Sequence, residues 1–301
     1  MSAAKTVRLS DFASEIGYET VRDASFRHVA KIATRLESMV VPLTDAAFAD
    51  ALCQSDRFAG VITSKAFADL VPPNLGLALS DTPGEAHAAL HARICAIPGL
   101  LWESFETEIG PGCSIAETAI IPPRDVRIGA GCVIAHGAVI HPRSVIGENV
   151  GVRERCVVGS AAYEIIKIGG RQVLRPQAGG VKLGDGVELL PGVSISRTAF
   201  GGFTSIGEAT VIDHNVVVSH DTEVGENTRV GGQGWIGGRV RIGNDVVIGP
   251  QVTITNGLTL GDRCHVSLGS VVTHDVPSGQ RVTGNFAIAH DRFIEALRKK
   301  R

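Results

Sequence analysis

The chain has 301 residues, 44% of them hydrophobic and 20% charged, which is enough for two domains that each bury a core. Its formal net charge of −2 argues against a general nucleic-acid-binding protein, because phosphate binding needs a basic surface. No apolar run reaches the roughly 18 residues of a membrane span, and Met1 to Val7 lacks the apolar core of a signal peptide. We therefore expect no transmembrane segment and a cytoplasmic location.

Residues 1–100 alternate between helical and strand patterns, which predicts a small α/β domain. Thr44 is expected to cap a helix through Leu52, and Thr82-Pro83-Gly84-Glu85 has the spacing of a capping box that opens a helix through Ile94. The other expected elements are a helix over Leu9–Ile16, strands at Met39–Leu43, Phe58–Thr63 and Leu75–Leu79, and a short helix at Lys65–Leu70.

From Ile109 onward an aliphatic residue returns at every sixth position. The pattern breaks at Gly159, is interrupted over residues 160–180, and slips again across Thr198–Phe203. It then continues without interruption at Ile206, Ile212, Val218, Val224, Val230, Ile236, Ile242, Ile248, Ile254, Leu260, Val266 and Val272.

A strict period of six belongs neither to an isolated helix nor to an isolated strand, so it indicates a larger coil. Gly, Asn, Asp and Thr lie between the aliphatic residues, and these residue types accept tight or left-handed turns. Each hexad is therefore expected to form one short strand and one corner, with three hexads to a triangular coil. The prediction is a mainly β protein with a parallel β-helix over residues 107–287.

Two segments fall outside the six-residue pattern. Residues 160–180 form a loop excursion that contains Tyr163 and three basic residues, a position where specificity is often built; a mobile surface insertion is the alternative. Residues 288–301 are expected to form a short C-terminal helix, with Phe293, Ile294 and Leu297 on one side, that caps the open end of the coil.

The cysteines give no indication of a metal site. Four of the six (Cys113, Cys132, Cys156 and Cys264) follow a hexad aliphatic residue by four positions, where other hexads carry small corner residues, and no CxxC pair occurs.

Residues 18 apart share a corner of the coil, so His220, Gly238 and Asn256 are expected to form one column, a groove floored by glycine. His220 could act as a general base on a hydroxyl or amine that attacks a thioester, with Asp213 or Asp221 orienting the imidazole. Backbone amides at Gly237-Gly238 could stabilise the oxyanion. A solvated corner histidine without a catalytic role is the alternative.

The hexads resemble the left-handed parallel β-helix acyltransferases, and the left-handed coil is implied by that resemblance alone. More closely, the chain resembles the UDP-3-O-acyl-glucosamine N-acyltransferases of lipid A biosynthesis. The similar segments are Val7–Phe12, the excursion ending at Arg175-Pro176-Gln177, and Ile212–Asn215 through Val218–Asp221.

The resemblance implies that His220 is the general base, that residues 1–100 bind the uridine of a nucleotide sugar, and that the protein is a homotrimer. The acyl donor would be acyl carrier protein, through its phosphopantetheine, or coenzyme A, with no tightly bound cofactor and no metal. Further candidate substrate-binding residues are His214, Asn215, Gly238, Asn256, Tyr163 and Gln177.

The chain also departs from this family. The family usually carries a second histidine where this sequence reads Thr255-Asn256-Gly257, and its uridine-binding run appears only as Asp45-Ala46-Ala47-Phe48. Two alternatives follow: an acetyl-CoA-dependent sugar O- or N-acetyltransferase of surface polysaccharide synthesis, or a non-catalytic scaffold that binds a sugar nucleotide.

Overall fold

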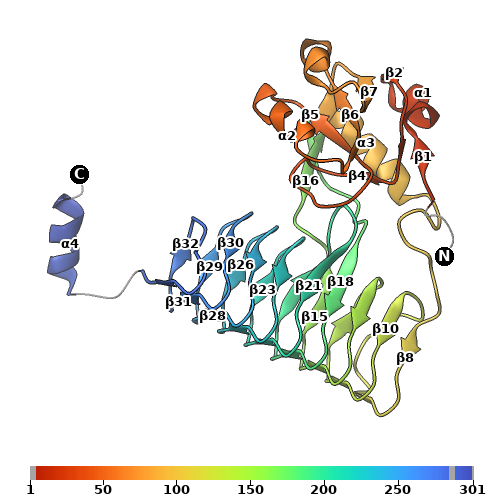
Figure 1. Ribbon diagram of the computed structural model, residues 1–301. Coiled ribbons are helices and arrows are strands. Elements are labelled where there is room, and N and C mark those ends of the chain that lie inside the picture. The colour runs from red at the N-terminus through yellow and green to blue at the C-terminus, as the bar shows by residue number, and fades with distance from the viewer. Residues whose placement is uncertain (1–4, 285–288, 300–301) are drawn as a thin grey trace.

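The computed structural model describes residues 5–284 and 289–299, which form an N-terminal α/β unit, a long β-helix and a C-terminal helix (Figure 1). The N-terminal unit contains a five-stranded sheet in the order β2-β7-β6-β5-β4, with β2 antiparallel to β7 and the other pairs parallel. Its strands are β1 Val7–Arg8, β2 Glu19–Arg22, β3 Ser25–Phe26, β4 His28–Val29, β5 Met39–Leu43, β6 Phe58–Thr63 and β7 Gly76–Leu79, and its helices are η1 Leu9–Phe12, α1 Ala13–Ile16, η2 Ala46–Phe48, α2 Ala49–Cys53, η3 Lys65–Leu70 and α3 Pro83–Cys95.

The strands predicted at Met39–Leu43 and Phe58–Thr63 are confirmed as β5 and β6. The cap predicted at Thr44 is wrong, because Asp45 is the residue whose side chain accepts a hydrogen bond at the start of η2. The predicted start of α3 is confirmed, with Thr82 at the N-cap and Pro83 at the first helical position, but the Thr82 side chain makes no capping hydrogen bond.

The β-helix has three faces, each a parallel sheet. The first face contains β8 Glu108–Ile109, β10 Val126–Ile128, β13 Ser144–Ile146, β18 Gly180–Leu183, β21 Phe203–Ile206, β24 Glu223–Val224, β27 Arg241–Ile242 and β30 Thr259–Leu260. The second contains β9 Ser114–Ile115, β11 Val133–Ile134, β14 Gly151–Val152, β19 Glu188–Leu189, β22 Val211–Ile212, β25 Arg229–Val230, β28 Val247–Ile248, β31 His265–Val266 and β33 Arg281–Val282. The third contains β12 Val139–Ile140, β15 Val157–Ser160, β20 Ser194–Ser196, β23 Val217–Val218, β26 Trp235–Ile236, β29 Thr253–Ile254 and β32 Val271–Val272.

Strand pairing confirms the predicted coil. Val218 pairs with Ile236 and Ile236 with Ile254, so each aliphatic residue stacks on the one a coil earlier. These side chains are buried and form one continuous core along the solenoid. The corners take left-handed backbone at every sixth residue, as at Asn215, Asp221 and Asn227, where φ lies between 52° and 58°. Asn and Asp tolerate this conformation better than most residues, although Gln233 and Arg239 adopt it at equivalent corners.

Both interruptions of the hexad pattern occur at the same corner, between the third and first faces. The excursion joins β15 to β18 and carries an antiparallel hairpin of β16 Ile165–Ile168 and β17 Arg171–Leu174. The slip at 198–203 joins β20 to β21. Ala162, Ala199 and Phe200 from these two segments pack into the core of the N-terminal unit, so the interruptions form the platform on which that unit rests (Figure 1).

The C-terminal helix α4 spans His290–Lys299. In Figure 1 it stands clear of the last coil, so the expected cap on the solenoid is not observed. The side chains of Phe293, Ile294 and Leu297 lie outside the described residues. Across the described part of the chain, no helix combines the length and apolar character needed to cross a membrane.

Candidate active site

The corner that carries the two interruptions also carries His220, one coil beyond the slip. His220 and Asp221 lie between β23 and β24, and the same corner holds Gly238 and Arg239 one coil later. Because the repeat is regular, two neighbouring columns of residues form here. One column contains His220 and Gly238, and the other contains Asp221 and Arg239. Residues 33–36 of the N-terminal unit lie across a cavity from this corner, where His220 and Gly238 are buried and Asp221 and Arg239 are partly exposed.

The imidazole of His220 is buried, with 5% of the residue exposed, and its orientation is fixed from one side. Asp221 Oδ2 lies 2.6 Å from His220 Nδ1. An ionised carboxylate only accepts hydrogen bonds, so Nδ1 carries a proton, and the lone pair of the ring in its neutral form lies on Nε2. Asp221 is held in turn by its backbone N–H, which donates to Thr204 Oγ1 at 3.0 Å.

Glu164 of the excursion lies on the opposite side of the ring. Its Oε2 is 3.7 Å from His220 Nε2 and 3.6 Å from Arg239 Nη1, and its Oε1 forms an ion pair with Lys31 of the N-terminal unit. Burial alone would raise the pKa of the Glu164 carboxyl, but Lys31, His220 and Arg239 together hold it below its usual value. The carboxylate therefore links the N-terminal unit, the excursion and the solenoid beside Nε2.

The predicted column is present, but it is not an open groove. The His220 ring covers Gly238, and a Cβ on Gly238 would lie 2.9 Å from ring atoms Cε1 and Nε2. The Gly238 N–H donates to Asn256 Oδ1 at 2.9 Å, and the Gly237 N–H donates to the Ile254 carbonyl at 2.9 Å. Both amides expected to stabilise an oxyanion are thus already bonded, whereas the Nδ2 group of Asn256 has no partner among the described residues.

Of the two candidate partners for the imidazole, only Asp221 contacts it. Asp213 instead bonds His214, with Oδ1 2.6 Å from Nδ1, and accepts from the Gly232 N–H at 3.1 Å. His214 and Asn215 are exposed on the preceding corner. In the part of the chain that the structure describes, no hydrogen bond or ion pair joins these three residues to His220.

The two candidate substrate-binding residues of the excursion, Tyr163 and Gln177, occupy different environments. Tyr163 points outward, with 83% of the residue exposed. Gln177 closes the base of the excursion, since its Oε1 accepts from the Ala162 N–H at 3.0 Å and its Nε2 donates to the Arg175 carbonyl at 2.6 Å. Gln177 therefore supports the loop that presents Glu164.

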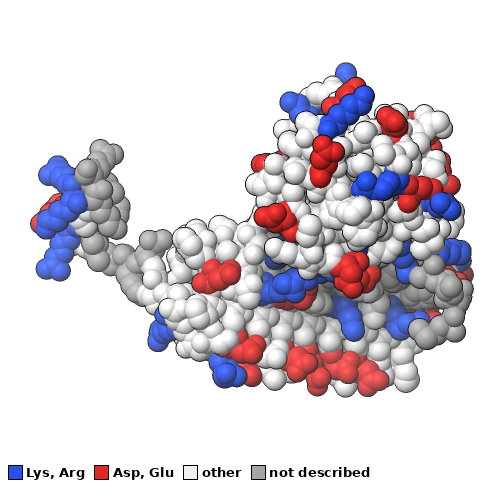
Figure 2. All heavy atoms as spheres, turned by 45° about the horizontal axis from the view of Figure 1, so that its top comes forward, with Lys and Arg blue, Asp and Glu red and all other residues white. Residues whose placement is uncertain are grey.

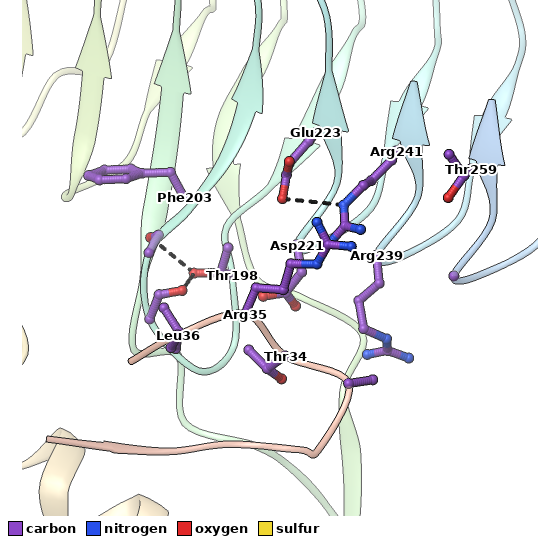
Figure 3. Close-up of a pocket in the computed structure, with 14 residues that line it drawn as sticks. Thr34, Arg35, Leu36, Thr198, Phe203, Asp221, Glu223, Arg239, Arg241 and Thr259 are labelled. Carbon is purple, nitrogen blue, oxygen red and sulfur yellow. Dashed lines mark hydrogen bonds and ion pairs between the residues drawn. The ribbon is translucent and has the colours of Figure 1, made fainter. Parts of the chain in front are cut away.

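A cavity of about 350 Å³ opens next to the dyad, between residues 33–36 and the first face of the solenoid (Figure 3). Its solenoid wall comprises the column that begins at Asp221 and the outward column Glu223, Arg241, Thr259 on β24, β27 and β30. Arg35 and Leu36 form the opposite wall, with Phe203 at one end. Asp221 belongs to both the cavity and the dyad, so the two are adjacent.

Sequence reasoning missed Lys31, Glu164, Arg239 and Arg241. Arg239 and Arg241 could have been found, because they lie 18 residues after Asp221 at the His220 corner and Glu223 at the start of β24. Glu164 and Lys31 could not, because they belong to segments without the repeat. Among the described residues, no group of three or more His, Cys, Asp or Glu side chains is arranged to hold a metal ion.

Comparisons with known proteins address the fold. Residues 124–160 match the model of the bacterial transferase hexapeptide family (six repeats). A comparison with curated protein sequences found no match. Among solved structures, the UDP-N-acetylglucosamine acyltransferase from Campylobacter jejuni is 22% identical with a TM-score of 0.53, and the similarity covers 64% of this chain and 78% of that chain.

Two further structures agree. Another UDP-N-acetylglucosamine acyltransferase is 22% identical with a TM-score of 0.55 over 60% of this chain and 67% of that chain. The one from Bacteroides fragilis is 23% identical with a TM-score of 0.52 over 57% and 65%. The chain thus carries bacterial transferase hexapeptide repeats and has the left-handed parallel β-helix fold that these acyltransferases share.

Proposed function

We propose that this protein is an acyltransferase that moves an acyl group from a thioester to the amine of a nucleotide-linked amino sugar. The observation that carries the proposal is the buried His220–Asp221 pair, in which Asp221 fixes the ring so that Nε2 is the basic atom. The hexapeptide repeats and the fold shared with UDP-N-acetylglucosamine acyltransferases add support for thioester chemistry on a sugar nucleotide.

In the proposed reaction the acceptor amine attacks the thioester carbonyl while His220 Nε2 takes one of its protons. The tetrahedral intermediate collapses, the carbon–sulfur bond breaks, and the leaving thiolate takes the proton back from the imidazolium. Asp221 stabilises the transient cation. Asn256 Nδ2 is the donor we assign to the oxyanion, because Oδ1 of the same amide is anchored on the Gly238 N–H.

Glu164 controls access in this proposal. It lies against Nε2 and is itself buried, so the amine must displace it to reach the base. Its other contacts are with Lys31 and Arg239, which would retain the carboxylate after a small movement. The acyl donor is acyl carrier protein or coenzyme A, and we also propose a homotrimer.

The test begins with ligand identification. Thermal-shift screening of UDP-, GDP- and dTDP-sugars, acetyl-CoA and acyl carrier protein exploits the stabilisation that a ligand gives to the folded state. Turnover of the active pair is then measured in His220→Gln and Asp221→Asn. We expect losses of about 10²–10⁴-fold for His220→Gln and at least about tenfold for Asp221→Asn, which disturbs the tautomer. Unchanged turnover in His220→Gln would contradict the assignment.

The same screen separates the alternatives. Stabilisation and turnover with acetyl-CoA would favour a sugar acetyltransferase. Binding of a sugar nucleotide without turnover of either thioester would favour a scaffold.

A further inference from the structure

Three arginines face the cavity beside the dyad from its two walls. Arg239 lies at the corner after Gly238 and Arg241 begins β27, and Arg35 reaches toward Arg241 from residues 33–36 (Figure 3). Basic side chains also gather in the hollow beneath the N-terminal unit in the space-filling view (Figure 2). The two halves of the protein therefore both contribute positive charge to one recess.

The hydrogen-bonding capacity of these three guanidinium groups is left free within the described residues. Among the described residues, no hydrogen bond involves the side chain of Arg35, Arg239 or Arg241. The nearest carboxylates are at ion-pair distance only, 3.6 Å between Glu164 Oε2 and Arg239 Nη1 and 3.8 Å between Glu223 Oε1 and Arg241 Nε. Arg239 Nη1 and Arg241 Nε are also buried without a hydrogen-bond acceptor. Such donors are costly unless a ligand satisfies them.

The acidic side chains around the recess do not cancel this charge. Asp221 is bonded to the imidazole of His220, and the single charge of Glu164 is shared between Lys31 and Arg239. Glu223 also lines the cavity and is largely exposed to solvent, with Oε1 3.8 Å from Arg241 Nε. An anion in the cavity would therefore compete mainly with Glu223.

We propose that this cavity binds a phosphate ester, with its oxygens held by Arg35, Arg239 and Arg241. The planar guanidinium fork matches a phosphate in two-point geometry, and arginine is the residue best suited to it. A volume of about 350 Å³ lies at the lower end of the range for small-molecule sites and fits the phosphate-bearing part of a larger substrate.

This assignment deepens the proposed function, on which it rests for the identity of the substrate. Two sources of the phosphate fit the chemistry: the diphosphate of a nucleotide-linked acceptor, or the phosphate of a pantetheine-bearing donor. Either would be anchored next to Asp221, so that its reactive end lies near His220. Since Arg35 belongs to the N-terminal unit, the bound phosphate would also hold that unit against the solenoid.

The experiment is calorimetric titration of the whole protein with pyrophosphate, UDP, uridine and coenzyme A. We expect binding of at least one phosphate compound and none of uridine at the same concentrations. Arg35→Gln/Arg241→Gln should weaken that binding at least tenfold. Arg229→Gln is the matched control. Like Arg241, Arg229 is the first residue of a two-residue strand, but it lies exposed on the second face of the solenoid. Glu223→Gln should tighten binding, since it removes the competing carboxylate.

Loss of UDP affinity in the double variant assigns the phosphate to the acceptor, and loss of coenzyme A affinity assigns it to the donor. The proposal is overturned if no phosphate compound binds the wild-type protein, or if the double variant binds as tightly as the Arg229→Gln control. These measurements need no turnover. A protein that binds phosphate through these arginines but retains turnover in His220→Gln would refute the proposed base and leave this site standing.

Discussion

The imidazole of His220 rests on Gly238, in space that any other residue at position 238 would fill. The ring atoms Cε1 and Nε2 would both lie 2.9 Å from a Cβ on residue 238. Gly238 therefore leaves the space in which the imidazole of the proposed base lies. This role differs from the oxyanion-binding amide that the sequence suggested.

Gly238→Ala should displace the imidazole and reduce turnover by at least about tenfold, because a small misplacement of a catalytic group is costly. The solenoid should persist, since the backbone hydrogen bonds of this corner do not depend on the side chain. Turnover and thermal melting are the measurements. Gly84→Ala, at an exposed position where a Cβ meets nothing within 4 Å, is the control. Full activity in Gly238→Ala would contradict this role.

Glu164→Gln tests the buried carboxylate without changing its size. At pH 7 we expect a loss of about 1–3 kcal/mol in the free energy of unfolding, because Lys31 and Arg239 lose their shared anion. The pKa of Glu164 is lowered in the folded state, so its contribution is present above the ordinary pKa of about 4.3 and is lost as pH falls through the folded value.

The stabilities of wild type and Glu164→Gln should therefore converge as the pH falls from about 4.3 through the lowered pKa of Glu164, as followed by denaturant titration at several pH values. A constant difference between them from pH 7 to pH 3 would show that the charge of Glu164 is irrelevant. Glu226→Gln, at an exposed corner, provides the control.

Because two histidines on α3 are buried, we expect the folded protein to lose stability at mildly acidic pH. Burial, reinforced by the nearby Arg175 charge, lowers the pKa of His87 and of His91 to about 3. Both rings are neutral in the fold, whereas the unfolded chain takes up protons as pH falls below about 6.5. Stability is thus retained above pH 6.5 and lost between about 6.5 and 3.

From pH 7 to pH 5.5 we expect the two rings to cost about 2–3 kcal/mol together. Thermal melts in that range are the measurement. His91→Gln should flatten the dependence, while His136→Gln at an exposed position should not. An unchanged slope in His91→Gln would contradict the prediction.

The proposed trimer predicts a role for the outer surface of the third face. Trp235 is 49% exposed and Val271 57% exposed, and Thr253 lies between them in the strand register. A flat solenoid face with exposed apolar side chains suits burial in a symmetric assembly. Trp235→Glu should shift the mass measured by light scattering from trimer to monomer, and Arg229→Glu on the second face should not. A wild-type monomer would refute the trimer.

The repeat made most of the solenoid predictable from sequence. A period of six specifies which side chain faces inward, and Asn or Asp at many of the left-handed corners indicates where those hexads turn. The His220, Gly238, Asn256 column followed from the same arithmetic. Local spacing does not specify how a column is filled, so neither the imidazole over Gly238 nor the bonded amides were foreseen.

The non-repeating segments were less predictable for a different reason. Glu164 reaches His220 only because the excursion folds back over the corner, a contact between residues far apart in sequence. β4 was missed because it has only two residues, and β2 because none of its side chains is fully buried. The cap at Asp45 was missed because two adjacent residues, Thr44 and Asp45, both have suitable side chains.

The regular stacking of coils also separates the parts of the solenoid that can change length from those that cannot. The site ends at Thr259 on β30, and β31 to β33 contribute neither to the dyad nor to the cavity. A complete coil added or removed beyond β30 would lengthen or shorten the rod without altering the geometry around His220. The same edit between Thr198 and His220 would lift the histidine away from the N-terminal unit by one strand spacing, about 4.8 Å. The length of the solenoid can therefore change at its C-terminal end without a change in the geometry of the site around His220.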